Sequence, residues 1–284
     1  DSTDTDEYKY YFYSGSGVMA KGWVENKKEQ KRYFSQANGH MCTGWVKSSA
    51  GNYRYFKPSN GIMYTGLEKI DSDYYYFSKS TGVRYQKGFG TVGSKKYYFN
   101  PSDGKAKTGW LELDGKKYYF DENGVMLTGW QCVKEKAEPG DGTGISRFVY
   151  LGGKEKGMLK GQWFETTEKP WDTKAWSTAL NTQAVRKNNT DETALMKKDG
   201  SRWFYLENDG TPLFLSAVAT GLKDGAVKLD GRYYFFDSYG VCQSGMIKFT
   251  SGGKTETAYF DPEAGGALSI GRNTNVVDLS LIHI

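Results

Sequence analysis

A glycine followed by a bulky apolar residue, most often tryptophan, recurs through the first half of this chain at nearly constant spacing. The intervals are 22, 22, 22, 21 and 20 residues, and each contains an aromatic run followed by a turn. A period of this length indicates a repeat protein, in which each unit buries its apolar face against its neighbours. The six pairs are Gly22-Trp23, Gly44-Trp45, Gly66-Leu67, Gly88-Phe89, Gly109-Trp110 and Gly129-Trp130.

The clearest copy of the repeat shows how one unit should fold. Asp-Gly at 114–115 is a strong signal for a two-residue hairpin turn, because both positions tolerate positive φ. We therefore predict strands over 110–113 and 116–120. Alternation along the return strand places Tyr118 and Phe120 on one face. A lone hairpin is marginal in water, so the next copy must cover that face.

The predicted fold class is all-β: a solenoid of stacked β-hairpin repeats of about 20 residues, with one irregular, partly helical insertion. Composition supports this prediction. Aromatic residues make up 16% of the chain and the mean hydropathy is −0.68, so aromatic rings must supply most of the buried area. The 36 glycines fit many tight turns.

The copies become irregular in the second half of the chain. Gly161 and Gly221 stand 60 residues apart, and an insertion is placed over 164–200. Within it, Asp172 is predicted to cap a short helix over 173–186. We expect the apolar face of this helix to pack on the stack, with a special binding role as the alternative. Its apolar residues are Ala175, Trp176, Ala179, Leu180 and Ala184.

The repeat pattern divides the chain into four parts. These are regular repeats over 1–163, the insertion over 164–200, further repeats over 201–271 and a tail over 272–284. The acidic, Ser/Thr-rich start is typical of a linker inside a longer protein, where a catalytic or adhesive domain is expected. The last six residues, Leu279–Ile284, resemble translated sequencing-adaptor sequence and are predicted to be an assembly scar.

Charge and reactive residues argue against several functions. The net charge of +5 comes from interspersed residues of both signs, so we expect no nucleic-acid partner. No stretch is apolar enough to predict a membrane span. Cys42, Cys132 and Cys242 are far apart, which argues against a metal site or a disulfide framework. His40 and His283 are the two histidines, and no nucleophile elbow or phosphate loop is present. We predict no catalysis, metal or cofactor, although carboxylate pairs have no local signature and leave an enzyme fragment open.

The full motif carries a family resemblance. It reads Gly-Trp, then Asp-Gly-Lys-x-Tyr-Tyr-Phe-Asp-x-x-Gly-x-Met-x-Thr, then the next Gly-Trp. This pattern resembles the cell-wall-binding (choline-binding-type) repeat family, which is related to repeats of clostridial toxins and glucan-binding proteins. The resemblance covers about residues 8–271 apart from the insertion, as expected for a repeat array. It implies stacked hairpins with ligand sites between neighbouring repeats.

The residue before Tyr-Tyr-Phe bears on the ligand. In choline-binding members the resemblance implies a cage of the Gly-Trp tryptophan, an aromatic residue at this position and a ring from the next repeat. Here the position is lysine in three copies, Lys31, Lys96 and Lys117. Like charges near 4 Å repel by about 4 kcal/mol, which outweighs a cation–π contact of about 0.5–2 kcal/mol. These copies are therefore predicted to suit glycans better than choline.

Copies that keep both aromatic residues are candidates for either ligand. The best pair is Trp45 with Tyr53, closed by Tyr74 or Tyr76 of the next copy. Trp130 with Phe148 and Trp163 with Trp203 are the other pairs. The predicted ligand-binding residues are Trp23, Trp45, Tyr53, Tyr74, Tyr76, Trp110, Trp130, Phe148, Trp163 and Trp203.

The predicted function is a non-catalytic binding module that attaches a secreted bacterial protein to cell-wall or surface glycans. Its partner would be a cell-wall polysaccharide, a teichoic acid or a host glycan. The alternatives are a choline-specific anchor to choline-decorated teichoic acid, and a structural adhesin stalk whose insertion makes the contact. All of these place the protein at the cell surface or outside the cell.

Overall fold

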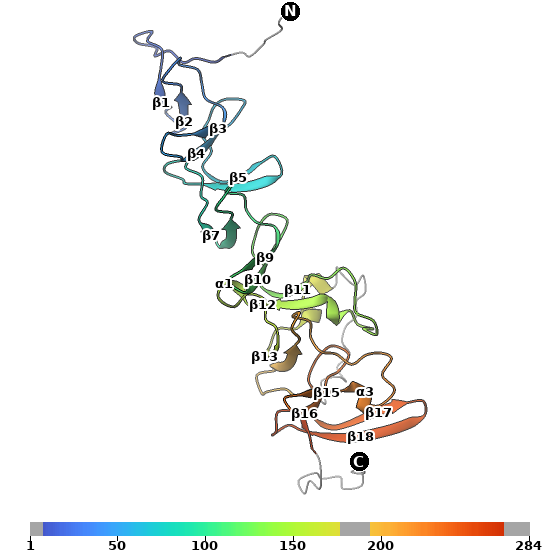
Figure 1. Cartoon of the computed structure of the whole chain (residues 1–284). Coiled ribbons are helices and arrows are strands. Elements are labelled where there is room, and N and C mark those ends of the chain that lie inside the picture. The colour runs from blue at the N-terminus through green and yellow to red at the C-terminus, as the bar shows by residue number, and fades with distance from the viewer. Residues whose placement is uncertain (1–7, 177–193, 270–284) are drawn as a thin grey trace, which may run out of the picture. The chain divides into compact units, whose positions relative to one another are not determined.

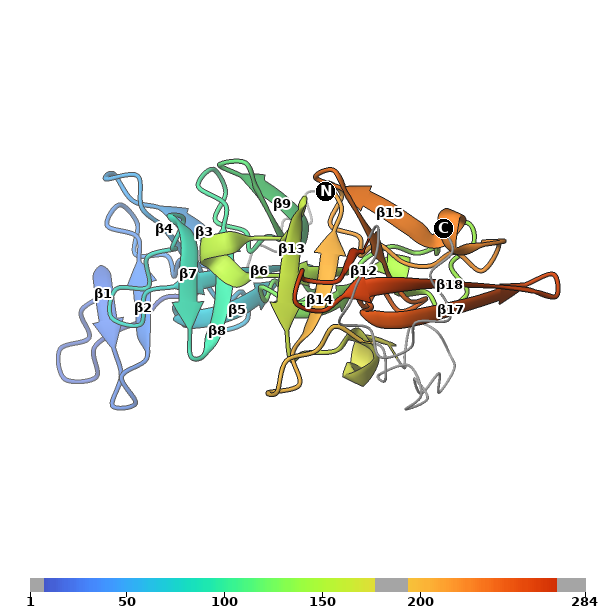
Figure 2. The same ribbon diagram turned by 90° about the horizontal axis from the view of Figure 1, so that it is seen from below.

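β-Hairpins make up most of the regular structure in the computed structural model, which describes residues 8–176 and 194–269 (Figures 1 and 2). The chain divides into two units. Within the described residues, unit 1 contains 8–111 and 119–126, and unit 2 contains the rest. Both are built from antiparallel hairpins with few short helices, so the predicted β-hairpin repeats are confirmed. No helix among the described residues has the length and hydropathy needed to cross a membrane.

Unit 1 is a series of two-stranded hairpins, each of which starts at a glycine of the repeat. In the first four of these hairpins the glycine pairs with the last phenylalanine of the return strand, as Gly44 pairs with Phe56. A further hairpin, β9 (Gly109–Leu113) with β10 (Lys116–Phe120), has residues in both units and carries the predicted turn, with Asp114 at φ 51° and Gly115 at φ 72°. The other hairpins are β1 (Gly22–Glu25) with β2 (Lys31–Phe34), β3 (Gly44–Lys47) with β4 (Tyr53–Phe56), β5 (Gly66–Ile70) with β6 (Asp73–Phe77), and β7 (Gly88–Val92) with β8 (Lys95–Phe99).

Neighbouring hairpins of unit 1 bury the last phenylalanine of each return strand. Phe56 is 1% exposed and Phe77 and Phe99 are fully buried. A backbone hydrogen bond also recurs between neighbours: the amide of Met63 donates to the Lys31 carbonyl, and that of Arg84 donates to the Tyr53 carbonyl, each at 2.8 Å. The donor is always the residue at the methionine position of the motif, two residues after the turn glycine. This bond fixes each hairpin on the one before it.

In unit 1 the turn glycine of a repeat packs against the residue at the methionine position of the previous repeat. Gly82 has φ +63°, and a Cβ there would lie 2.6 Å from Cε of Met63. Gly44 has a similar φ of +67°, but a Cβ there would meet no atom within 4 Å. Alanine substitutions at the two glycines therefore separate the cost of backbone strain from the cost of overpacking.

We expect Gly82→Ala to lower the free energy of unfolding by about 2–4 kcal/mol, the sum of left-handed strain and overpacking. Gly44→Ala should cost about 1–2 kcal/mol, from the strain alone. Urea denaturation of both variants measures the difference. Equal losses would show that the Met63 contact does not restrict this turn.

Unit 2 has the same hairpin plan with longer connections. Its hairpins are β11 (Gly129–Cys132) with β12 (Phe148–Leu151), β13 (Gln162–Thr166) with β14 (Arg202–Leu206), and β15 (Ala226–Leu229) with β16 (Arg232–Phe235). A three-stranded sheet follows, of β17 (Gly245–Ser251), β18 (Lys254–Asp261) and β19 (Ala267–Leu268). The short helical turns are η1 (Ile145–Arg147), α1 (Gly153–Lys156), η2 (Pro170–Asp172) and α3 (Leu222–Gly225).

The insertion interrupts one hairpin. Strand β13 before it pairs with β14 after it, so 164–166 lie in a strand and 167–201 connect the two strands. Of the predicted helix, residues 174–176 are helical, and 177–186 lie outside the described residues. The cap is Thr173 and not Asp172, because the Thr173 hydroxyl accepts a hydrogen bond from the Trp176 amide at 3.2 Å.

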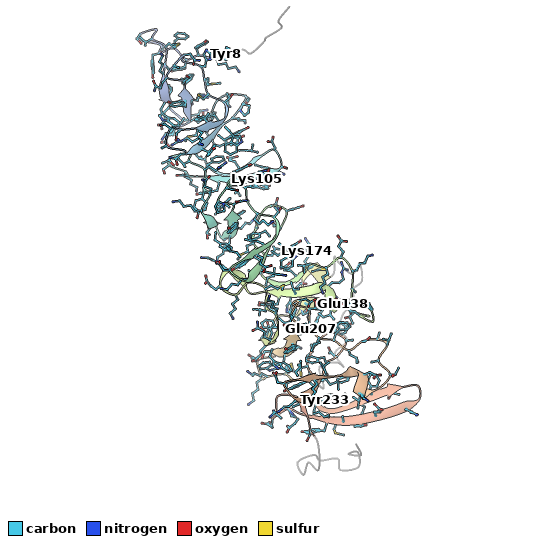
Figure 3. All side chains as sticks on the ribbon, in the orientation of Figure 1. Tyr8, Lys105, Glu138, Lys174, Glu207 and Tyr233 are labelled. Carbon is cyan, nitrogen blue, oxygen red and sulfur yellow. The ribbon has the colours of Figure 1, made fainter. Side chains whose placement is uncertain are left out.

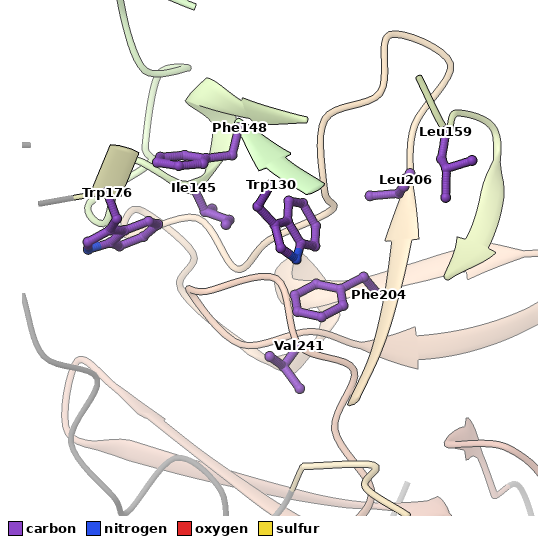
Figure 4. Close-up of a cluster of buried hydrophobic side chains, with 8 residues drawn as sticks. All are labelled: Trp130, Ile145, Phe148, Leu159, Trp176, Phe204, Leu206 and Val241. Atoms are coloured by element: carbon purple, nitrogen blue, oxygen red, sulfur yellow. The ribbon is translucent and has the colours of Figure 1, made fainter. Parts of the chain in front are cut away.

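The core of unit 2 forms where this connection meets the hairpins (Figure 4). Trp130 is 2% exposed, and its Nε1 donates to the Glu168 carbonyl at 3.2 Å. Trp176, also 2% exposed, packs on Phe148 with ring centroids 5.1 Å apart. Ala175 packs on the same cluster, which confirms the expected core packing for the described part of the helix.

Candidate ligand-binding notches between hairpins

Three positions of the repeat meet at the junction of neighbouring hairpins. They are the residue after the repeat glycine, the residue before Tyr-Tyr-Phe in the same hairpin, and the residue at the methionine position of the next hairpin. The recurring backbone hydrogen bond brings the second and third positions together. We call each such set an inter-hairpin notch. The clearest described examples are Trp23, Lys31 and Met63; Trp45, Tyr53 and Arg84; and Trp163, Trp203 and Cys242.

The Trp23 notch holds a partly exposed ring beside an ion pair. Trp23 is 48% exposed and contacts Phe56 of the next hairpin, with centroids 6.0 Å apart. The ammonium of Lys31 lies 3.7 Å from the Glu25 carboxylate. Both residues line a pocket of about 390 Å³ with Trp23 and Met63. This notch therefore combines one exposed ring with both signs of charge.

The Trp45 notch already contains a cation. The guanidinium carbon of Arg84 lies 4.4 Å from the Tyr53 ring centroid and 5.3 Å from the Trp45 ring centroid. Its Nη2 donates to Oε1 of Gln86 at 2.6 Å. Burial lowers the pKa of Arg84, but an arginine guanidinium stays protonated in proteins. Arg84 thus occupies the faces that a quaternary ammonium would need.

Of the residues predicted to surround Trp45, Tyr53 shares its notch, whereas Tyr74 and Tyr76 pack on another cluster. The next hairpin contacts Trp45 through Tyr75, with centroids 5.0 Å apart. Tyr76 instead contacts the buried Phe99 of the following hairpin, and Tyr74 packs on the buried cluster that contains Phe99. Tyr76 still lines a pocket with Tyr53, whereas the Tyr74 hydroxyl donates to Asn123 at 3.2 Å.

Trp130 and Phe148 lie in the buried core of unit 2, where neither presents a surface face. Phe148 is fully buried, and Trp130 contacts Tyr150, with centroids 5.4 Å apart, and Phe204. Burial, followed by the nearby Glu168 carboxylate, raises the pKa of Tyr150 to about 12.

Trp163 and Trp203 do come together, with ring centroids 6.4 Å apart and planes at 76°. Both line a pocket of about 530 Å³ with Tyr234, whose ring is 4.8 Å from that of Trp163. The ammonium of Lys197 lies 5.5 Å from the Trp203 ring. Burial raises the pKa of the third notch residue, Cys242, to about 12, so its thiol acts as a small apolar group.

Trp110 is the remaining predicted ring. It is 38% exposed and packs edge-on against Tyr119 of its own hairpin, with centroids 4.9 Å apart.

Lysines cover the aromatic residues that precede Tyr-Tyr-Phe. Lys47 lies over Tyr53 and Lys69 over Tyr74, each 5.4 Å from the ring centroid, because both pairs are directly opposed in their hairpins. Tyr233 (Figure 3) has Lys228 at 5.7 Å in the same arrangement. Neither these lysines nor Arg84 was predicted as part of a notch. The lysines could have been predicted from the hairpin register, which places each of them opposite its tyrosine.

Segments of the chain match two families of repeats. Residues 28–66 and 107–138 match the choline-binding repeat family. Residues 65–83, 87–106 and 197–211 match the putative cell wall binding repeat family. These matches confirm the predicted resemblance to cell-wall-binding repeats of the choline-binding type. Glucosyltransferase-S of Streptococcus downei is 29% identical over 144 residues, which are 49% of this chain and 10% of that protein.

Solved structures share the fold. CbpJ from Streptococcus pneumoniae TIGR4 superposes with a TM-score of 0.56 at 22% identity, over 95% of this chain and 87% of that one. Choline binding protein F from Streptococcus pneumoniae gives a TM-score of 0.50 at 21% identity, over 82% of this chain and 60% of that one. A second structure of protein F was determined in the presence of a peptidoglycan analogue, a tetrasaccharide-pentapeptide, with a TM-score of 0.50 at 22% identity.

Proposed function

We propose that this chain is a non-catalytic binding module that attaches a secreted bacterial protein to cell-wall or surface glycans through its inter-hairpin notches. The observation that carries the proposal is the exposure of three repeat tryptophans. Trp23, Trp45 and Trp110 are 48%, 39% and 38% exposed, although each packs edge-on against a tyrosine of its own hairpin. Such rings offer a rigid apolar surface beside polar groups, as glycan sites require.

The family matches support a cell-wall partner. The repeats resemble cell wall binding repeats, and a structural relative was crystallised with a peptidoglycan analogue. Attachment to the wall implies a cell-surface or secreted location. Because the chain spans only part of these relatives, the activity of any attached domain is a separate question.

A choline-specific anchor is the less favoured function. A choline site needs uncovered aromatic faces, but Lys47, Lys69 and Arg84 already lie over the rings that would form it. A second cation would be repelled at the same place. Glycan hydroxyls meet no such penalty.

We also propose that the hairpins stack as a solenoid and that the insertion at 164–200 interrupts a single repeat. The recurring amide-to-carbonyl bond at the methionine position supports the first proposal, since the Met158 amide donates to the Lys117 carbonyl at 2.7 Å in unit 2 as others do in unit 1. The pairing of β13 with β14 across the insertion supports the second.

Cosedimentation with purified Gram-positive cell walls tests the proposed function. We expect the triple variant Trp23→Ala, Trp45→Ala, Trp110→Ala to lose binding by about tenfold or more, because each ring removes contact area at a separate notch. Val218→Ala is the matched control, since Val218 is 75% exposed and is not a notch residue. Unchanged wall binding by the triple variant would place the contact surface elsewhere, and deletion of 167–201 then tests the insertion.

A further inference from the structure

We propose that the pocket beside Arg84 binds an anionic sugar, with its carboxylate or phosphate on Arg84. The inference rests on the proposed glycan-binding function and names the chemistry of one site. The pocket has a volume of about 440 Å³ and lies between the hairpins β3–β4 and β5–β6 and the turn that follows them. That volume accommodates a sugar unit.

The lining of this pocket is aromatic, polar and positively charged. Tyr53 and Tyr76 supply rings, Ser78 and Thr81 supply hydroxyls, and Arg84 supplies a cation. A second cation comes from the exposed Lys87. The lining includes no aspartate or glutamate. The Asp103 carboxylate opposes the lowering of the Arg84 pKa by burial, but Asp103 does not line the pocket.

Arg84 is held in place while part of its guanidinium keeps no protein partner. Its backbone amide donates to the Tyr53 carbonyl at 2.8 Å, and its Nε and Nη2 donate to Oε1 of Gln86 at 3.3 and 2.6 Å. Within 8–176 and 194–269, Nη1 has no hydrogen-bond acceptor, and neither Arg84 nor Lys87 pairs with a carboxylate. A guanidinium fixed in this way is suited to carboxylate or phosphate oxygens, because it loses little side-chain freedom on binding.

The preceding notch shows why this chemistry is local to Arg84. There the methionine position is Met63, and the residue before Tyr-Tyr-Phe is Lys31 and not an aromatic residue. Lys31 is paired with Glu25, and both line the same pocket with Arg54. An anionic sugar would meet the Glu25 carboxylate in that notch, whereas the charged side chains that line the Arg84 pocket are both cations.

Isothermal titration calorimetry at low ionic strength tests the inference with three small probes. These are methyl β-glucuronide, glucose 6-phosphate and the uncharged methyl β-glucoside. We expect the wild type to bind at least one anionic probe about tenfold more tightly than the glucoside, as a charge-assisted hydrogen bond provides. The tighter of the two anionic probes identifies carboxylate or phosphate as the recognised group.

Arg84→Met should abolish this preference, because methionine occupies the same position in the preceding repeats, as Met41 and Met63, and keeps the fold. Lys79→Met, at an exposed position outside the pocket, removes the same charge and should keep the preference. A wild type that binds no anionic probe, or a preference that survives in Arg84→Met, overturns the inference. Wall cosedimentation is run in parallel. Wall binding without an anionic preference refutes this inference alone, whereas an anionic preference without wall binding refutes the proposed function and keeps the pocket.

Discussion

Replacing Trp130 with alanine is expected to lower the free energy of unfolding of unit 2 by about 3–5 kcal/mol, the usual loss for a buried tryptophan. Trp130 is 2% exposed and contacts Phe164 and Phe204, with centroids 6.0 and 5.1 Å away. Its removal opens a cavity among aromatic side chains that cannot collapse onto it. It also leaves the Glu168 carbonyl without the indole donor at 3.2 Å. Urea denaturation followed by far-ultraviolet circular dichroism measures the loss.

Trp23→Ala is the matched control, because Trp23 holds the same position in the repeat motif. At 48% exposure it has far less contact area to lose. We expect a loss of about 1–2 kcal/mol. Similar losses for the two variants would mean that burial does not distinguish these tryptophans. The contrast also affects how wall-binding experiments are interpreted. Weak binding by a Trp130 variant would reflect a folding defect and not the loss of a ring that contacts the ligand.

Replacing both Lys47 and Arg84 with methionine is expected to create a binding site for choline. The double variant removes the guanidinium that lies 4.4 Å from the Tyr53 ring and 5.3 Å from the Trp45 ring, and the ammonium that lies 5.4 Å from the Tyr53 ring. The methionine thioethers are uncharged, so the Tyr53 and Trp45 rings become available to a quaternary ammonium. Choline at about 100 times its dissociation constant should then stabilise the variant by about 2.7 kcal/mol. Thermal unfolding with and without choline measures the gain, and the wild type should show none.

Arg54→Met is the control for this prediction. Arg54 lies 5.4 Å from the Trp23 ring, so its removal also uncovers a tryptophan. Lys31 remains in that notch, however, and its charge should prevent choline binding. A wild type stabilised by choline as strongly as the double variant would show that Lys47 and Arg84 do not block the notch. It would also restore the choline-specific anchor as the favoured function.

The repeat and its hairpins could be predicted because their signals are local. The Asp-Gly turn at 114–115 and the alternation that buries Tyr118 and Phe120 act over a few residues, and the structure has both. The helix cap was predicted one residue early. Asp172 and Thr173 are adjacent and both are good capping residues, and only the hydrogen bond to the Trp176 amide separates them.

The sequence by itself determined the period, the hairpins and the kind of side chain that would line the junctions. Only the tertiary structure decided which rings are open to a ligand. Arg84 reaches Tyr53 because of a backbone hydrogen bond between residues 31 positions apart. Trp130 is buried because the insertion and β14 cover it. The same motif position is therefore surface in one repeat and core in another, since exposure depends on which distant segment packs there and not on the residue's own neighbours in the chain.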